Sequence, residues 1–262
     1  MAEEIKGFPI LRVTEEGRSE VEDIVAREFA FTIILDNQEL VTLLCTPKDL
    51  KYLAAGFLSS EGLITNNGEI RKIVLDERRG VARVETWGDK GVATDLLFKR
   101  LITSGCGRGA SFYSAADTTD QPRVESQVKI SASEVFALAK EFQHRSQVFR
   151  ATGGVHSAAM CDTKGILIFA EDLGRHNAID KIFGECMLKD MPTDDGIVIT
   201  SGRISSEILL KTAKRNIPIV ISKSAPTDLA VGLAVDLGVT LIGFVRGRRM
   251  NIYANGWRVT EE

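Results

Sequence analysis

Residues 197–222 read IVITSGRISSEILLKTAKRNIPIVIS, and this stretch decides the fold class. Two runs of mainly β-branched residues, at 197–200 and 217–222, enclose a segment with helical spacing at 205–215. The alternation continues outward, with further strands predicted at 155–161, 166–170 and 239–245 and further helices at about 131–148, 175–189 and 226–237. Strands that alternate with helices predict a layered α/β domain with a largely parallel or mixed sheet.

The first hundred residues or so show a different pattern, which predicts a small α+β unit. Residues 27–45 and 70–87 each contain two β-rich runs around turn residues, so each is predicted to form a hairpin. Between the hairpins, Thr46 is predicted to cap a helix that runs to about Ser60. The polar stretch 114–129, which contains Pro122, is the predicted boundary between a domain at 1–115 and a domain at 128–262.

Composition narrows the class of protein. The chain has 262 residues, 44% of them hydrophobic, which is enough for one large or two modest cores. Its 33 basic and 36 acidic residues give a formal charge of -3, which argues against a nucleic-acid partner and leaves only local anion sites. The start lacks the pattern of a secretory signal, and no run of 18 apolar residues occurs. We therefore expect a soluble, cytoplasmic protein with no membrane partner.

Four cysteines are spread along the chain without a C-x-x-C pair, which argues against a zinc knuckle and a dithiol redox motif. We predict that Cys45, Cys161 and Cys186 pack in cores, because unpaired cysteine behaves as a small hydrophobe. Cys106 differs, since it lies in TSGCGRG at 103–109, where glycines remove bulk and Arg108 favours the thiolate. From these residues alone, Cys106 is either a nucleophile or a small residue in a turn.

The loops after the predicted C-terminal strands form a second candidate site. At the carboxyl ends of strands in an α/β sheet, helix N-termini and their free N–H groups commonly bind phosphate. The loops contribute six cations: Arg175, Arg203, Lys223, Arg246, Arg248 and Arg249. They predict a crevice for a phosphorylated or nucleotide ligand. His156 and His176 are either part of this site or structural, and we expect no structural metal.

Several segments, taken together, carry a family resemblance: TSGCGRG, TGGVHSAAM, EDLGRHNAIDK, SGRISSEILLK, SKSAPTDLA and GFVRGRRMNIY. In this order they resemble the FdhD/NarQ family, the formate dehydrogenase accessory sulfurtransferases. The resemblance runs from near residue 30 to about Tyr253.

The resemblance implies a sulfur carrier. Such a carrier accepts sulfur from a cysteine desulfurase as a persulfide and delivers it to the molybdenum or tungsten cofactor, bis-molybdopterin guanine dinucleotide, before the cofactor enters formate dehydrogenase. Cys106 matches the persulfide-bearing cysteine, but Gly109 stands where many members have a second cysteine. The matching cofactor-binding stretch is Phe244, Val245, Arg246, Gly247, Arg248 and Arg249.

The family's C-terminal fold is similar to that of cytidine deaminases, which implies a three-layer α/β/α domain, and a homodimer is expected. Zinc deaminases carry metal ligands at two strand-to-helix turns. Here those turns hold Arg175, His176, Ser201 and Arg203, which we expect to bind the guanine nucleotide of the cofactor instead.

Three functions are therefore compatible with the sequence. The first is sulfur transfer through Cys106, the second is a cofactor-binding chaperone without covalent chemistry, and the third is a nucleotide-modifying hydrolase on a deaminase-like fold.

Overall fold

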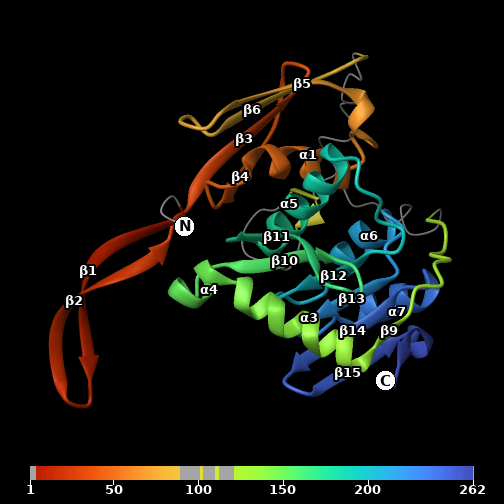
Figure 1. The fold of residues 1–262 in the computed structure, drawn as a ribbon. Helices are drawn as coiled ribbons and strands as arrows, with labels where there is room; N and C mark the ends of the chain where they lie inside the picture. The colour runs from red at the N-terminus through yellow and green to blue at the C-terminus, as the bar shows by residue number, and fades with distance from the viewer. Residues whose placement is uncertain (1–3, 89–100, 103–109, 112–120, 262) are drawn as a thin grey trace.

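The computed structural model describes residues 4–88, 101–102, 110–111 and 121–261. The chain begins with a two-stranded ribbon, followed by a four-stranded sheet of order β4-β3-β6-β5 and one helix that packs against it (Figure 1). These elements are β1 (Ile5–Thr14), β2 (Gly17–Ala26), β3 (Phe29–Leu35), β4 (Gln38–Cys45), α1 (Leu50–Ser60), β5 (Ile70–Asp76) and β6 (Val81–Thr86). The short strands β7 (Leu101–Ile102) and β8 (Ala110–Ser111) then pair antiparallel.

The C-terminal part is built on a six-stranded mixed sheet of order β11-β10-β12-β13-β14-β15. Strands β12, β13 and β14 are mutually parallel, and the other neighbours pair antiparallel. The elements are β9 (Ile130–Ser131), α3 (Ala132–Arg145), α4 (Gln147–Thr152), β10 (His156–Cys161), β11 (Ile166–Asp172), α5 (Arg175–Leu188), β12 (Ile197–Thr200), α6 (Ser206–Ala213), β13 (Ile219–Ser222), α7 (Asp228–Asp236), β14 (Thr240–Arg246), β15 (Arg249–Ala254) and β16 (Val259–Thr260).

Helices cover both faces of this sheet. One core lies between the sheet and α5, α6 and α7, and a second lies between the sheet and α3 (Figure 1). Neighbouring strand residues alternate between the cores: Val198 and Val220 face the first, whereas Ile199 and Ile221 face the second. The predicted α/β class, with its α+β N-terminal unit, is confirmed, whereas the likeness to cytidine deaminases stays a prediction.

The three cysteines predicted to lie in cores are there. Cys45, Cys161 and Cys186 are each at most 2% exposed. Burial raises the pKa of Cys45 to about 12 and that of Cys186 to about 11, and it raises the pKa of Cys161 as well. These thiols are therefore protonated at neutral pH.

Two predictions about helices are wrong. Thr46 does not cap the first helix, which begins at Leu50 after Asp49, a residue in the left-handed region with φ of 56°. The Thr46 side chain is used elsewhere, because it bonds to the carboxylate of Asp172. The helix predicted at about 131–148 is also broken, since it ends at Arg145 and a separate α4 follows.

The sequence analysis also missed the β1–β2 ribbon and strand β15, although both predicted hairpins of the N-terminal unit form. The proposed domain boundary at 114–129 lies partly outside the described residues, so the division into 1–115 and 128–262 stays a prediction. No helix among the described residues is long and apolar enough to span a membrane.

Helices α1 and α5 pack so closely that each needs a glycine at the contact. A Cβ atom on Gly56 would lie 1.7 Å from the carbonyl oxygen of Asp180, and one on Gly184 would lie 1.9 Å from that of Tyr52. Both neighbours are backbone atoms of the facing helix, so they cannot turn aside as a side chain would. The contact fixes α5, and with it the edge of the large sheet, against the N-terminal unit.

We expect Gly184→Ala to lower the free energy of unfolding by about 2–3 kcal/mol, because the added methyl group forces α1 and α5 apart. Gly232→Ala in α7 is the matched control: its Cβ would meet nothing within 4 Å, and alanine favours helix by about 0.5–1 kcal/mol. Denaturant unfolding of the two variants measures the difference. Equal stability of both variants would contradict the role of the close contact.

Candidate functional site

The predicted crevice forms at one edge of the large sheet. The carboxyl ends of the parallel strands β12, β13 and β14 meet there, next to the start of the antiparallel strand β10. A cavity of about 910 Å³ opens at this edge. It is lined from α3 and α4 by Phe136, Ala137, Ala139, Lys140, Phe142, Gln143, Ser146, Phe149 and Arg150, and from the sheet by His156, Ser157, Ser201, Lys223, Ser224, Val245, Arg246, Gly247 and Arg248.

The cavity wall is basic and partly aromatic. Five cations line it, namely Lys140, Arg150, Lys223, Arg246 and Arg248, together with three phenylalanines. Among the described residues, no Asp or Glu belongs to this wall. Burial and the charge of Arg246 lower the pKa of Lys223, which reflects this concentration of positive charge. A ligand with both an aromatic ring and negative charge matches such a surface.

Hydrogen bonds fasten the loops of the sheet edge to one another. The Ser222 hydroxyl donates to the carbonyl of Gly202 at 2.7 Å and accepts from the Ser224 backbone N–H at 2.9 Å. The Ser201 backbone N–H donates to the Ser157 carbonyl at 3.0 Å. The loops that follow β12 and β13 are therefore held in place independently of any ligand.

A β-bulge turns the end of β14 toward the cavity. The pairing of β14 with β15 shifts register between Gly243 and Arg246, and Phe244 has a φ of 53°. A bulky residue in the left-handed region is unusual and is a strained conformation. The Phe244 N–H donates to the Ser224 carbonyl at 3.1 Å, which supports the bulge. As a result Val245 and Arg246 line the cavity, whereas Phe244 does not.

His156 presents one ring nitrogen to Ser201. Its Nδ1 lies 3.3 Å from the Ser201 hydroxyl oxygen, which already accepts from the Ser157 N–H at 2.9 Å. The Ser157 N–H and the Ser201 hydroxyl thus hold the ring of His156 in a fixed position beside the loop that follows β12. Burial lowers the pKa of His156, and the charges of Arg175 and Arg203 lower it further. A neutral imidazole ring therefore borders the cavity at neutral pH.

The other predicted site residues lie next to the cavity wall. Arg175, His176, Arg203 and Arg249 do not line it. A Cβ atom on Gly202 would lie 2.9 Å from the Cβ of Arg175 and 3.5 Å from Nδ1 of His156, so glycine is needed where the β12 loop meets α5. All predicted contacts with a ligand, within the wall or beside it, stay predictions.

A buried network positions the start of α5. The Asp172 carboxylate pairs with Lys181 at 2.7 Å and accepts from the Gly174 N–H at 3.0 Å and from the Asn177 side chain at 2.8 Å. Thr46, from the N-terminal unit, donates to the same carboxylate through its backbone N–H at 3.0 Å. These bonds hold the turn that carries Arg175 and His176.

The sequence analysis missed the wall that α3 and α4 contribute. The sequence signal for this wall was the three-to-four spacing of one helix face, which Phe136, Lys140 and Gln143 share. Gln143 accepts a hydrogen bond from the Lys223 side chain at 3.1 Å, so this helix contacts the sheet edge directly.

Cys106 lies outside the described residues, and the flanking strands β7 and β8 pair with each other.

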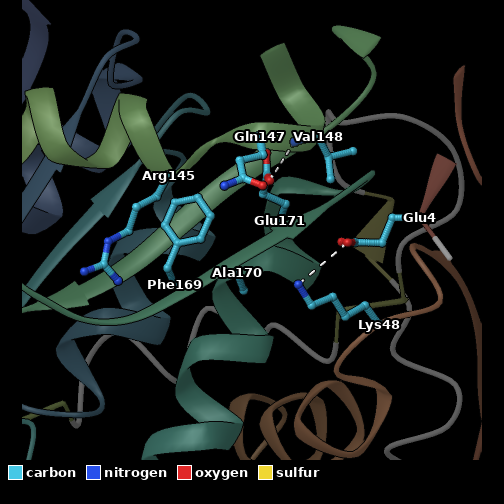
Figure 2. Close-up of a pocket in the computed structure, with 8 residues that line it drawn as sticks. All are labelled: Glu4, Lys48, Arg145, Gln147, Val148, Phe169, Ala170 and Glu171. Atoms are coloured by element: carbon cyan, nitrogen blue, oxygen red, sulfur yellow. Dashed lines mark hydrogen bonds and ion pairs between the residues drawn. The ribbon is translucent and has the colours of Figure 1, made fainter. Parts of the chain in front are cut away.

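A smaller cavity of about 260 Å³ is lined by Glu4, which precedes β1, by Lys48, and by residues at the α3–α4 break and in β11 (Figure 2). Its carboxylates already have partners. Glu171 accepts from the N–H groups of Val148 and Phe149 at 3.0 and 2.9 Å, and Lys48 lies 3.6 Å from Glu4. The cavity is thus a structural junction that fixes the start of α4.

In the described part of the chain, no three His, Cys, Asp or Glu side chains gather as metal ligands would.

Comparisons with known proteins agree with this arrangement. The sequence profile of the FdhD/NarQ family matches residues 26–260. Sulfur carrier protein FdhD of Bacillus pumilus is 46% identical over 239 residues, which cover 91% of each chain, and that of Bacillus subtilis is 45% identical over 248 residues, which cover 94% of this chain and 95% of the relative.

A solved structure from Desulfotalea psychrophila, described as a formate dehydrogenase accessory protein, superimposes with a TM-score of 0.81. It is 26% identical, and the match covers 98% of this chain and 99% of that one. The whole architecture, including the N-terminal unit, is therefore shared with that protein.

His176 makes stability depend on pH. Burial, followed by the charges of Lys211 and Arg175 and by His156, lowers its pKa to about 2, although Glu207 lies 3.6 Å from its Nε2. In the unfolded chain the ring binds a proton below about pH 6.5, whereas in the folded protein it stays neutral at that pH. The unfolded state therefore binds more protons, so the contribution of His176 to stability is present above about pH 6.5 and is lost on acidification. Between pH 7 and 5 we expect His176→Gln to remove up to about 2 kcal/mol of this loss.

Unfolding by denaturant at pH 7, 6 and 5 measures the effect. His144→Gln is the matched control because His144 is exposed at the end of α3. If His176→Gln lost as much stability on acidification as the control, the interpretation of His176 as a neutral ring in the folded protein would be wrong.

Proposed function

The chain belongs to the FdhD/NarQ family, and from this membership we propose that it is a sulfur carrier that serves a formate dehydrogenase. It accepts sulfur from a cysteine desulfurase and passes it to the molybdenum or tungsten cofactor, which is its client rather than a resident group. The names of the relatives and of the solved structure support the sulfur-carrier and accessory roles. The finer steps rest on the residues of this chain.

Cys106 is the proposed carrier of sulfur. Its thiolate attacks the terminal sulfur of the desulfurase persulfide, one S–S bond forms as another breaks, and the desulfurase thiolate leaves. The exchange needs one nucleophile and no external oxidant. The burial and raised pKa values of Cys45, Cys161 and Cys186 support this assignment, because thiols inside a core are poor nucleophiles. Gly109 is then no obstacle, since a single thiol suffices.

The cavity at the sheet edge is the proposed site for a guanine nucleotide half of bis-molybdopterin guanine dinucleotide. The observation that carries this proposal is the wall of five cations and three phenylalanines, free of acidic residues within the described chain. Arg246, Arg248 and Lys223 are suited to the phosphates, because arginine and lysine make charge-assisted bonds to them. Phenylalanine side chains from α3 and α4 provide the apolar surface for a ring.

The second candidate is a chaperone that binds the cofactor without covalent chemistry. The same cavity supports it, and the absence of a second cysteine at Gly109 favours it. The two functions differ only in the need for Cys106.

We expect Arg246→Ala and Arg248→Ala each to weaken binding of GDP about tenfold, because each removes a charged partner of the phosphates. Isothermal titration calorimetry with GDP measures this. Arg78→Ala is the matched control, since Arg78 is an exposed arginine in the turn between β5 and β6 and does not line the cavity. Equal losses in all three variants, or none in any, would count against the assigned cavity.

We expect the protein to gain one sulfur atom on the Cys106 peptide when it is incubated with a cysteine desulfurase and cysteine. Peptide mass spectrometry measures the gain, and Cys106→Ala is the control. Labelling that persists in the variant, or that spreads over the buried cysteines, would reject the persulfide. If Cys106→Ala also supported formate dehydrogenase activity, the non-covalent chaperone would be preferred.

A further inference from the structure

The three phenylalanines of the cavity wall differ in how far they serve the packing of the fold. Phe142 is 1% exposed and packs edge-on against Phe169, with ring centroids 5.6 Å apart. Phe136 packs against the core between the sheet and α3. Phe149 is 46% exposed, and it belongs to none of the cores that the described residues form. Phe149 therefore lines the cavity without filling a core.

The backbone that carries Phe149 is held at both ends of α4. The Phe149 N–H donates to Glu171 at 2.9 Å, beside the bond from Val148 to the same carboxylate (Figure 2). At the other end, the N–H of Gly153 donates to the Phe149 carbonyl at 2.7 Å, and its φ of 66° is in the left-handed region that favours glycine. A ring on a fixed backbone loses little conformational entropy when a planar group stacks on it.

The topology places Phe149 at one end of the cavity and two arginines at the other. Helix α4 leads into β10, and Glu171, which binds α4, lies in β11 next to β10. Arg246 ends β14, and Arg248 follows it. Strands β12 and β13 lie between β10 and β14, so the ends of β10 and β14 are about 14 Å apart across the sheet. Because both ends line one cavity, a nucleoside diphosphate that lies along the sheet edge contacts both.

The charge along the sheet edge gives this ligand a direction. The β10 and β12 side contributes the neutral ring of His156 and the hydroxyl of Ser201, whereas the β13 and β14 side contributes Lys223 and Arg246. This gradient belongs to the sheet edge alone, because the other cations of the wall include two from the helices. Phosphates favour the β14 end, which leaves the base at the β10 end, where Phe149 lies.

We propose that Phe149 is the residue on which the purine base of the nucleotide stacks, with the diphosphate at Arg246 and Arg248. The inference rests on the proposed function, because it takes a nucleotide in this cavity as its premise. Stacking on an aromatic ring adds affinity for every base, since each base has a π face. Phe149 thus sets the affinity for the base and the orientation of the ligand, and does not select guanine over adenine.

Calorimetric titration with two probes, GDP and inorganic pyrophosphate, tests the assignment. We expect Phe149→Leu, which stays apolar but loses the ring, to weaken GDP binding about tenfold and to leave pyrophosphate binding unchanged. Arg246→Ala weakens binding of both probes. Trp87→Leu is the matched control and binds both as the wild type does, because Trp87 is 72% exposed and does not line the cavity. An equal loss for both probes in Phe149→Leu would overturn the proposal.

The fluorescence of Phe149→Trp provides a test that does not depend on lost binding. We expect this variant to bind GDP, because tryptophan also stacks, and we expect GDP to quench the added fluorescence while pyrophosphate does not. The wild-type chain, with Trp87 and Trp257, gives the background signal. If GDP binds to the variant without quenching, the base lies elsewhere and the proposal is wrong.

Failure of this inference and failure of the proposed function are distinguishable. A wild-type chain that does not bind GDP would reject the nucleotide cavity itself. If the wild type binds GDP and Arg246→Ala weakens binding while Phe149→Leu does not, the cavity stands and only the role of Phe149 is rejected. A changed oligomeric state of Phe149→Leu in light scattering, with unchanged GDP affinity, would assign the exposed ring to a protein contact instead.

Discussion

Thr46 of the N-terminal unit is bound to a buried ion pair of the C-terminal part, formed by Lys181 and Asp172. Both side chains are at most 1% exposed, and their charged atoms lie 2.7 Å apart. Taking two charges out of water is costly, so such a pair is stable only when its remaining donors and acceptors are satisfied. Thr46 supplies an acceptor and a donor for this pair, because its hydroxyl accepts from Lys181 at 2.7 Å and its backbone N–H donates to Asp172. The N-terminal unit thus completes a charge network that belongs to β11 and α5.

A second buried pair extends the same constraint along α5. Lys211 of α6 contacts Asp180 at 2.8 Å, and Ser60 at the end of α1 donates to Asp180 at 2.6 Å. Between the two networks, the glycine contact of α1 with α5 leaves no space for even a methyl group. All four charged residues belong to the C-terminal part, so removal of the N-terminal unit would leave both ion pairs in place but would take away the hydrogen bonds from Thr46 and Ser60 that complete them. The N-terminal unit and the C-terminal part are therefore packed together along α1 and α5.

The sequence predicts the strands of the large sheet and the edge at which their loops meet, because both depend on local patterns of residues. Runs such as 197–200 and 217–222 are apolar and β-branched because both faces of those strands are buried, and the polar loops after parallel strands must meet at one edge. The position of Thr46 could not be predicted, because a cap and a long-range partner of Asp172 use the same hydroxyl. The α3 wall was missed for a related reason: Lys140 and Gln143 have the appearance of a solvated helix face until the fold brings the sheet edge to them.

The break between α3 and α4 explains why side chains, rather than helix N-termini, give the cavity its charge. Ser146 turns its hydroxyl back to the Phe142 carbonyl and toward Ser157, and α4 starts in a new direction that brings Phe149 and Arg150 to the wall. The first N–H groups of α4 are bound to Glu171, and an N–H group of α7 is bound to Thr227. These donors are already used and cannot bind phosphate. Glu171 meanwhile faces the smaller cavity, so its negative charge is kept out of the basic wall (Figure 2). A chain with a formal charge of -3 can thus present a cationic surface, because no carboxylate among the described residues lines that surface and Glu171 is occupied by the backbone of α4.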